Sequence, residues 1–240
     1  MKIVILLLAF CLSIGSSVAE TTGPPLNQNA ANAATVIDKV FQLKYLGTDG
    51  VIDYPAVYNT LGALAGFACQ MTIREGFVAK GIISEDKAFV VLKLKDGRRY
   101  FYGDNLNAFL FGDNGFKYSV WSLVAGAAQR NGAKQFPDLR EIAEYNAQVL
   151  GSEKFGVPRI PGQYRSKELP VEAVAKYWPD LLNIFKQEKV DPVIWSATIA
   201  FAIQTMMLQN SSKLDPEITL KIVMEAAVPM SKIDPETVKK

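Results

Sequence analysis

The sequence predicts a predominantly helical α+β fold, with a small antiparallel β-meander packed on a helical core. Apolar residues recur at three- and four-residue spacing along most of the chain, which is typical of helices with one buried face. The spacing changes to two residues over 77–102, which is typical of strands. The chain has 240 residues, of which 49% are hydrophobic and 21% charged. Since a chain of this length can bury a full core, we expect one globular domain over residues 29–240.

The N-terminal 19 residues have the features of a secretory signal peptide. Lys2 supplies a positive charge, residues 3–14 are almost wholly apolar, and small residues precede a cleavage point before Glu20. A membrane anchor is the alternative, but the apolar run is shorter than the roughly 20 residues that a bilayer core requires. We therefore expect a bacterial protein that is exported to the periplasm or secreted, with no transmembrane segment after signal cleavage.

Residues 20–28 contain Gly23-Pro24-Pro25 and no periodic pattern, which predicts a flexible leader. From Ala33, apolar residues at helical spacing predict a first helix that ends at Gly47. A second helix is expected over 55–75. Its small residues include Gly62 and Gly66, one turn apart, so we expect another backbone to approach closely there and offset the poor helix propensity of glycine.

The strongest local pattern is a β-hairpin. Residues 88–94 and 99–102 are rich in apolar and aromatic side chains, and Asp96-Gly97 between them predicts a type I′ turn. Residues 77–83 are expected to add a third strand, because an isolated hairpin is marginally stable in water.

A loop is expected over 103–117, since its Asp, Asn and Gly residues favour turns. Two helices then follow. Ser119 caps the first of them, Pro137-Asp138 opens the second, and the second ends at Gly151 before a proline-containing loop over 152–169.

In the last third, four helical segments are expected. Aspartate followed by proline opens two of them, at Asp191-Pro192 and Asp215-Pro216, while Pro170 and Pro179 open two shorter ones. The segment 192–208 carries no charge, so it belongs in a protein core or in a bilayer. Its Ser, Thr and Gln residues and its length favour the core.

Composition excludes much catalytic chemistry. The sequence has no histidine, which removes Ser-His-Asp and Cys-His catalysis and the common histidine-based zinc sites. Of the two cysteines, Cys11 lies in the signal sequence and Cys69 in an apolar stretch, so we expect a buried thiol and no intramolecular disulfide. Signal cleavage would remove Lys2 and leave 25 basic against 24 acidic residues, so net charge selects no partner.

Two carboxylates are the candidate catalytic residues. Glu75 lies at the end of the small-residue helix and Glu225 lies within IVMEAAVPM. Apolar surroundings raise the pKa of a carboxyl group, as a general acid requires. A helix-end acid, or an acid paired with Arg or Lys, is the ordinary structural alternative.

The candidate binding surface joins the aromatic return strand to the Asx-rich loop. Its residues are Tyr100, Tyr102, Asp104, Asn105 and Asn107. No calcium-loop motif occurs there, so we expect no metal site, and no motif indicates a cofactor. Basic residues between 80 and 99 favour a solvated sheet face, and export disfavours nucleic acid as a partner.

The segments TDGVIDYPAVYNTLGALAGFACQ, YFYGDNLNA, SVWSLVAGAAQ and IVMEAAVPMSKIDP resemble a set of uncharacterised bacterial proteins. The resemblance covers about half of the chain and implies no activity. The sequence therefore favours an exported, non-catalytic binding or interaction protein, whose partner is an unknown protein or small ligand in the cell envelope. A carboxylate-based hydrolase of cell-wall glycan or peptide is the alternative, and a ligand carrier with an apolar pocket beside residues 195–207 is a third.

Overall fold

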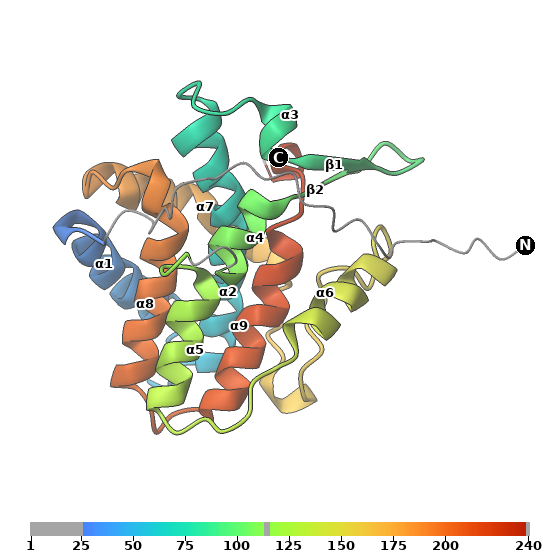
Figure 1. Ribbon diagram of the computed structural model, residues 1–240. Helices are drawn as coiled ribbons and strands as arrows, with labels where there is room; N and C mark the ends of the chain where they lie inside the picture. The colour runs from blue at the N-terminus through green and yellow to red at the C-terminus, as the bar shows by residue number, and fades with distance from the viewer. Residues whose placement is uncertain (1–25, 113–115, 239–240) are drawn as a thin grey trace, which may run out of the picture.

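The computed structural model describes residues 26–112 and 116–238 (Figure 1). The predicted signal peptide and most of the predicted leader lie outside these residues. The fold is predominantly helical α+β, with one antiparallel hairpin. The described helices are α1 (Gln28–Lys44), α2 (Tyr54–Ile73), α3 (Glu85–Ala88), α4 (Asp104–Phe111), α5 (Val120–Arg130), α6 (Leu139–Gln148), α7 (Pro170–Gln187), α8 (Trp195–Gln209) and α9 (Pro216–Met230).

The core is built around α2, which is buried over nearly its whole length. It packs against α7, α8 and α9, and α5 packs on α8 and α9. Figure 1 shows α5, α8 and α9 as neighbouring helices in front of α2. Local signals explain where α2 begins: the Asp53 side chain accepts a hydrogen bond from Ala56 N (3.1 Å), and Pro55 occupies the first turn.

The predicted close approach at the two glycines is confirmed, and the partner is α9. A Cβ atom on Gly62 would lie 2.6 Å from the carbonyl oxygen of Val223, and one on Gly66 would lie even closer to that of Ala227. Because Gly62 faces Val223 and Gly66 faces Ala227, the two helices run parallel at this contact. Glycine is needed here because any side chain would collide with the backbone of α9.

The third strand predicted over 77–83 is wrong. After Ile73 the helix widens into a π-helical turn, Arg74–Val78, with Ala79 N donating to Arg74 O (2.8 Å) and Ile82 N donating to Phe77 O (2.9 Å). The apolar residues of this stretch pack individually on the core; the Phe77 ring, for example, lies 6.0 Å from that of Phe109. The two-residue period therefore reflects separate buried contacts and not a strand.

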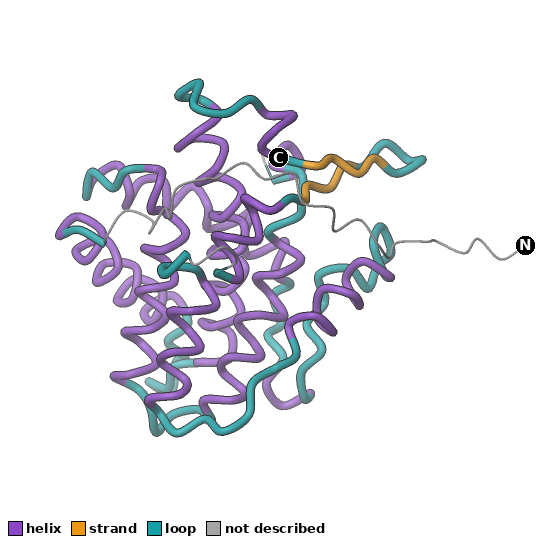
Figure 2. The backbone as a smooth tube through the Cα atoms, in the orientation of Figure 1, coloured by secondary structure: helices purple, strands orange, loops and turns teal. Residues whose placement is uncertain are grey.

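The hairpin consists of β1 (Val90–Lys93) and β2 (Arg99–Tyr102). The turn lies where Asp96-Gly97 predicts it, but the prediction of a type I′ turn is wrong. Gly97 has φ 89°, whereas Asp96 is not in the left-handed region. Leu94 N donates to Arg98 O (2.9 Å) and Gly97 N to Leu94 O (3.0 Å), which describes a three-residue loop with a glycine bulge. Figure 2 shows this hairpin projecting from an otherwise helical body.

The C-terminal segment takes the place of the missing strand. Phe101 N donates to Lys232 O (2.9 Å), and Tyr100 forms an isolated antiparallel bridge with Ile233. The Gln70 side chain of α2 donates to Ser231 O and Ile233 O, both at 3.0 Å. This segment therefore ties the hairpin to the central helix.

Three further expectations need correction. The first helix starts at Gln28, capped by Asn27, so the end of the predicted leader is part of the fold. The loop predicted over 103–117 contains α4, because its Leu and Phe residues supply a buried face. Pro179 does not open a helix but lies inside α7. It is tolerated there because it is exposed, as is Ala175, whose carbonyl loses its partner and faces solvent.

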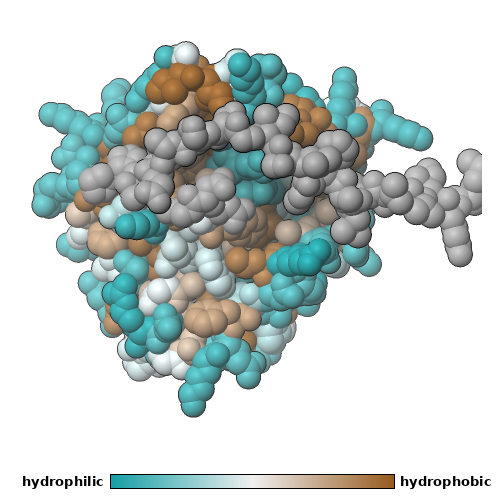
Figure 3. Space-filling view, viewed as in Figure 1, coloured by the Kyte–Doolittle hydropathy of each residue, from teal (hydrophilic) through white to brown (hydrophobic). Residues whose placement is uncertain are grey.

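One described helix, Pro192–Gln209, is long and apolar enough to cross a membrane by length and composition. In this fold it packs against α1, α2 and α5, and 61% of it is buried. That placement matches the core position favoured by its polar residues. On the face shown in Figure 3, hydrophilic side chains form most of the outline and smaller apolar areas lie between them.

Candidate functional site

The structure does not bring Glu75 and Glu225 together. Glu75 is exposed in the π-helical turn after α2, whereas Glu225 is buried in α9. Ala227 faces Gly66 in the parallel α2–α9 contact, so Glu225 lies level with the residue about two positions before Gly66. Glu75 is then about eleven positions further along the chain, or roughly 16 Å along the helix axis. These two carboxylates do not share a cleft.

Glu225 is the acid of a buried ion pair. Its side chain is 1% exposed, and its carboxylate accepts from Arg159 Nη2 (2.9 Å) and from Arg159 N (3.2 Å). Burial raises the pKa of Glu225, and the interactions with Arg159 oppose that rise. Glu225 is therefore paired with an arginine, which is the ordinary structural alternative to a catalytic acid.

The candidate binding residues near the hairpin do not form one surface cavity. Tyr100 is buried against the Phe155 ring (5.0 Å) and lines a small cavity of about 200 Å³. Tyr102 is half-buried, and burial raises its pKa to about 12. Asp104, Asn105 and Asn107 belong to α4, and the Asn105 side chain donates to Ala88 O (3.4 Å). Both Asp104 and Asn105 are exposed. They lie on a helix, since the predicted loop folds as α4 in this stretch.

A larger groove lies elsewhere, between α6, α9 and the loop over 152–169. Its volume is about 610 Å³, within the range of small-molecule sites. In Figure 1 this loop runs in yellow to light orange below α6. The lining side chains combine aromatic, proline, aliphatic and basic groups: Tyr145, Glu153, Lys154, Val157, Pro158, Arg159, Ile160, Pro161, Arg165 and Lys221.

Arg159 is held rigidly in the wall of this groove. Besides the pair with Glu225, its Nη1 donates to Glu141 (2.5 Å) from α6. Its guanidinium lies 4.0 Å from the centre of the Tyr145 ring. Because carboxylates and an aromatic face hold the guanidinium, Arg159 orders this part of the loop against α6 and α9.

Three other cations line the groove without a direct ion pair to an acid among the described residues: Lys154, Arg165 and Lys221. Of these, Lys221 is close enough to Glu225 to lower the pKa of that carboxyl group. Arg165 Nε donates to Ile160 O (3.2 Å). The two terminal amino groups of Arg165 have no hydrogen-bond partner in the described part of the chain. Among the described residues that line the groove, Glu153 is the one acid. The groove has four positive charges, those of Arg159 and the three other cations. The two acids beside Arg159, together with Glu153, supply three negative charges, so the groove keeps a positive excess that can hold an anion.

Sequence reasoning missed this groove. The usable signal was the length of the loop over 152–169, because loops beyond about 12–15 residues in a compact domain are uncommon and often functional. Within 26–112 and 116–238, no group of three or more Cys, Asp or Glu side chains is arranged to hold a metal ion.

No family model matches this chain. No curated protein and no solved structure matches it either.

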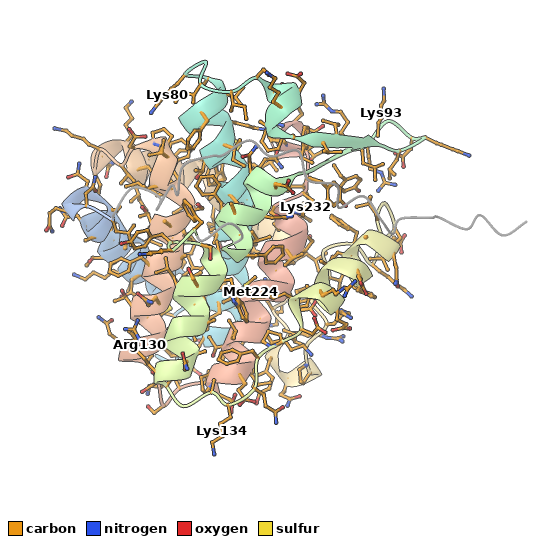
Figure 4. All side chains as sticks on the ribbon, viewed as in Figure 1. Lys80, Lys93, Arg130, Lys134, Met224 and Lys232 are labelled. Carbon is orange, nitrogen blue, oxygen red and sulfur yellow. The ribbon has the colours of Figure 1, made fainter. Side chains whose placement is uncertain are left out.

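A second unusual charge is Lys232, which lies in the body beneath the base of the hairpin (Figure 4). It is 7% exposed, and no carboxylate in the described chain forms an ion pair with it. Its Nζ lies 5.2 Å from the centre of the Tyr102 ring. Burial lowers the pKa of Lys232 to about 8, while burial raises the pKa of nearby Cys69 to about 12, so the thiol stays neutral.

This burial predicts a pH-dependent stability. The unfolded chain protonates Lys232 near pH 10.5 and the folded chain near pH 8, so this group makes stability rise between these values. Lys232→Met should raise the free energy of unfolding by up to about 3 kcal/mol at pH 7, with a smaller gain above pH 10.5. Urea denaturation across this pH range checks it. Lys39→Met, at an exposed position, is the control; equal behaviour of both variants would contradict the assignment.

Proposed function

We propose that this protein is an exported, non-catalytic binding protein that holds a small organic anion in the groove between α6, α9 and the loop over 152–169. The observation that carries the proposal is a set of three cations, Lys154, Arg165 and Lys221, that form no direct ion pair among the described residues and lie beside Arg159 and Tyr145. Cations left without protein partners favour an anionic ligand, and the apolar lining favours one with an organic part.

The sequence features of residues 1–19 support export, and a ligand would then come from the cell envelope or the medium. A hydrolase built on Glu75 and Glu225 has no comparable support, because one carboxylate is exposed and the other is bound to Arg159. The remaining candidate residues, from Tyr100 to Asn107, are assigned no part in this groove.

The first test is native mass spectrometry of the full chain purified gently from the exported fraction of a bacterial host. We expect a mass that begins at Glu20 with additional bound mass, which identifies the ligand. A panel of carboxylates and phosphate esters is then compared with the matching neutral amides and alcohols by ligand-observed NMR. Only the anions should bind.

Arg165→Ala combined with Lys221→Ala should weaken anion binding by about tenfold or more, since a charge-assisted hydrogen bond contributes about 1.5–3 kcal/mol. The matched control is Lys39→Ala with Arg130→Ala, which removes two cations outside the groove lining. Binding of neutral analogues as tight as that of anions, or equal loss in both double variants, would contradict the proposal. Failure of every anion to bind would overturn it.

A further inference from the structure

The exposed edge of β1 is a second, independent candidate for molecular recognition. All four residues of β1 are exposed, and among the described residues the strand pairs only with β2. The opposite edge of the hairpin is already covered, because β2 bonds to the segment around Lys232. One unpaired edge therefore remains on a hairpin that projects from the body (Figure 1).

The register shows which backbone groups of β1 are free. Phe101 N points toward Lys232 O and so away from β1. Val91 lies opposite Phe101, and residues opposite each other in an antiparallel pair direct their N–H and C=O groups alike, both inward or both outward. Val91 and, two residues on, Lys93 therefore direct their backbone groups outward, while Val90 and Leu92 bond to β2.

The side chains along this edge are unusually apolar for exposed positions. Val90 is 66% exposed, Val91 47% and Leu92 45%. An incoming strand would cover part of this surface while it satisfies the outward backbone groups, which is how sheet edges bind extended peptides.

The charge at this edge selects the partner. Lys93 extends from the hairpin (Figure 4), and Lys95 follows in the turn; neither has a carboxylate partner among the described residues. The two arginines of the hairpin are already paired, Arg98 with Asp96 (2.5 Å) and Arg99 with Asp234 (2.7 Å). A second copy of the chain would bring four unpaired lysines together, whereas an acidic segment would neutralise them.

We propose that an extended, acidic polypeptide segment binds by adding a strand to β1. Its backbone pairs with Val91 and Lys93, its apolar side chains cover Val90 and Leu92, and its carboxylates meet Lys93 and Lys95. This site is separate from the anion groove, so either proposal can fail without the other.

The probe is the peptide acetyl-Glu-Val-Glu-Val-Glu-Val-amide, with its Lys-for-Glu counterpart as the charge control. Titration into the full, ¹⁵N-labelled protein should slow hydrogen exchange at the Val91 and Lys93 amides. The acidic peptide should bind more tightly than the basic one. Equal affinity for both peptides, or unchanged exchange at Val91 and Lys93, overturns the proposal.

Val91→Pro tests the backbone contact directly, because proline removes an outward N–H that β2 does not use. It should weaken binding of the acidic peptide by about fivefold to tenfold, whereas Val91→Thr, which keeps the N–H, should bind nearly as wild type. Equal binding by both variants overturns the proposal. A concentration-dependent dimer in sedimentation that Val91→Pro abolishes also overturns it, since the occupant would then be a second copy.

If Val91→Pro does not fold, as judged by its amide spectrum, the charges provide the test. Lys93→Glu combined with Lys95→Glu leaves the ladder intact and should reverse the preference, so that the basic peptide binds more tightly. An unreversed preference overturns the proposal.

Discussion

Gly66→Ala is expected to destabilise the protein by about 3 kcal/mol or more, the upper end for overpacking a core. The added methyl group would overlap the carbonyl group of Ala227, and a backbone group in the middle of α9 cannot rotate away as a flexible side chain can. To relieve the overlap, α2 and α9 would have to separate, and their buried contacts would loosen together. Urea denaturation followed by circular dichroism measures the loss.

Gly126→Ala is the matched control, because Gly126 also lies inside a helix but a Cβ there meets nothing within 4 Å. Alanine should stabilise this position by about 0.5–1 kcal/mol through helix propensity alone. The contrast in sign separates the effect of the helix contact from that of glycine itself. A Gly66→Ala variant as stable as wild type would show that the two helices do not touch as described.

Arg159→Met is expected to cost about 3 kcal/mol at pH 7, because it leaves the buried Glu225 carboxylate without its cation. Arg159 lowers the pKa of Glu225, so its removal raises that pKa further above the ordinary 4.5. The folded variant then binds a proton more readily than the unfolded chain, and stability should recover as the pH falls from 7 toward 4.5. Denaturation measured at several pH values checks both the loss and its direction.

Two variants control for this effect. Arg140→Met breaks an exposed pair with Glu144 (3.0 Å) and should change stability by no more than about 0.5 kcal/mol. Arg159→Met combined with Glu225→Gln removes the unpaired charge and should regain part of the loss, with little pH dependence from this site. If Arg159→Met and Arg140→Met behave alike, the pair with Glu225 does not contribute as proposed.

Local capping signals made much of the helical fold predictable. Asp138, Asp191 and Asp215 each accept backbone hydrogen bonds at the start of a helical segment, as their position beside proline or before an apolar run indicates. The hairpin and the close helix crossing were also predictable, because each depends on glycine at a defined place. The helix that packs against these glycines was not predictable, since Val223 and Ala227 lie 161 residues after Gly62 and Gly66, which they face.

The wrong elements share a cause. Residues 77–83 and 104–111 have compositions that suit strands or turns locally, but tertiary contacts decide their conformation. The alternating apolar residues of the first stretch bury one at a time, and the Leu and Phe residues of the second complete a helix against α2 and α5. Propensity is a weak guide where burial overrides it.

The candidate site was harder still to predict. An acid in an apolar stretch, such as Glu225, has the same sequence context whether it is catalytic or ion-paired, and Arg159 lies 66 residues away in the chain. The groove takes residues from α6, a loop and α9, so no single window of sequence contains it.

The attachment of the hairpin to the C-terminal segment has a consequence for how the chain folds. Strand β2 and helix α2 both bond to residues 231–233, which the ribosome adds more than 125 residues after β2. During synthesis the apolar α2 and the outer edge of β2 therefore lack these partners until residues 231–233 have been made. Contacts this distant in sequence slow folding, so the hairpin and the central helix become joined only late in the folding of the chain.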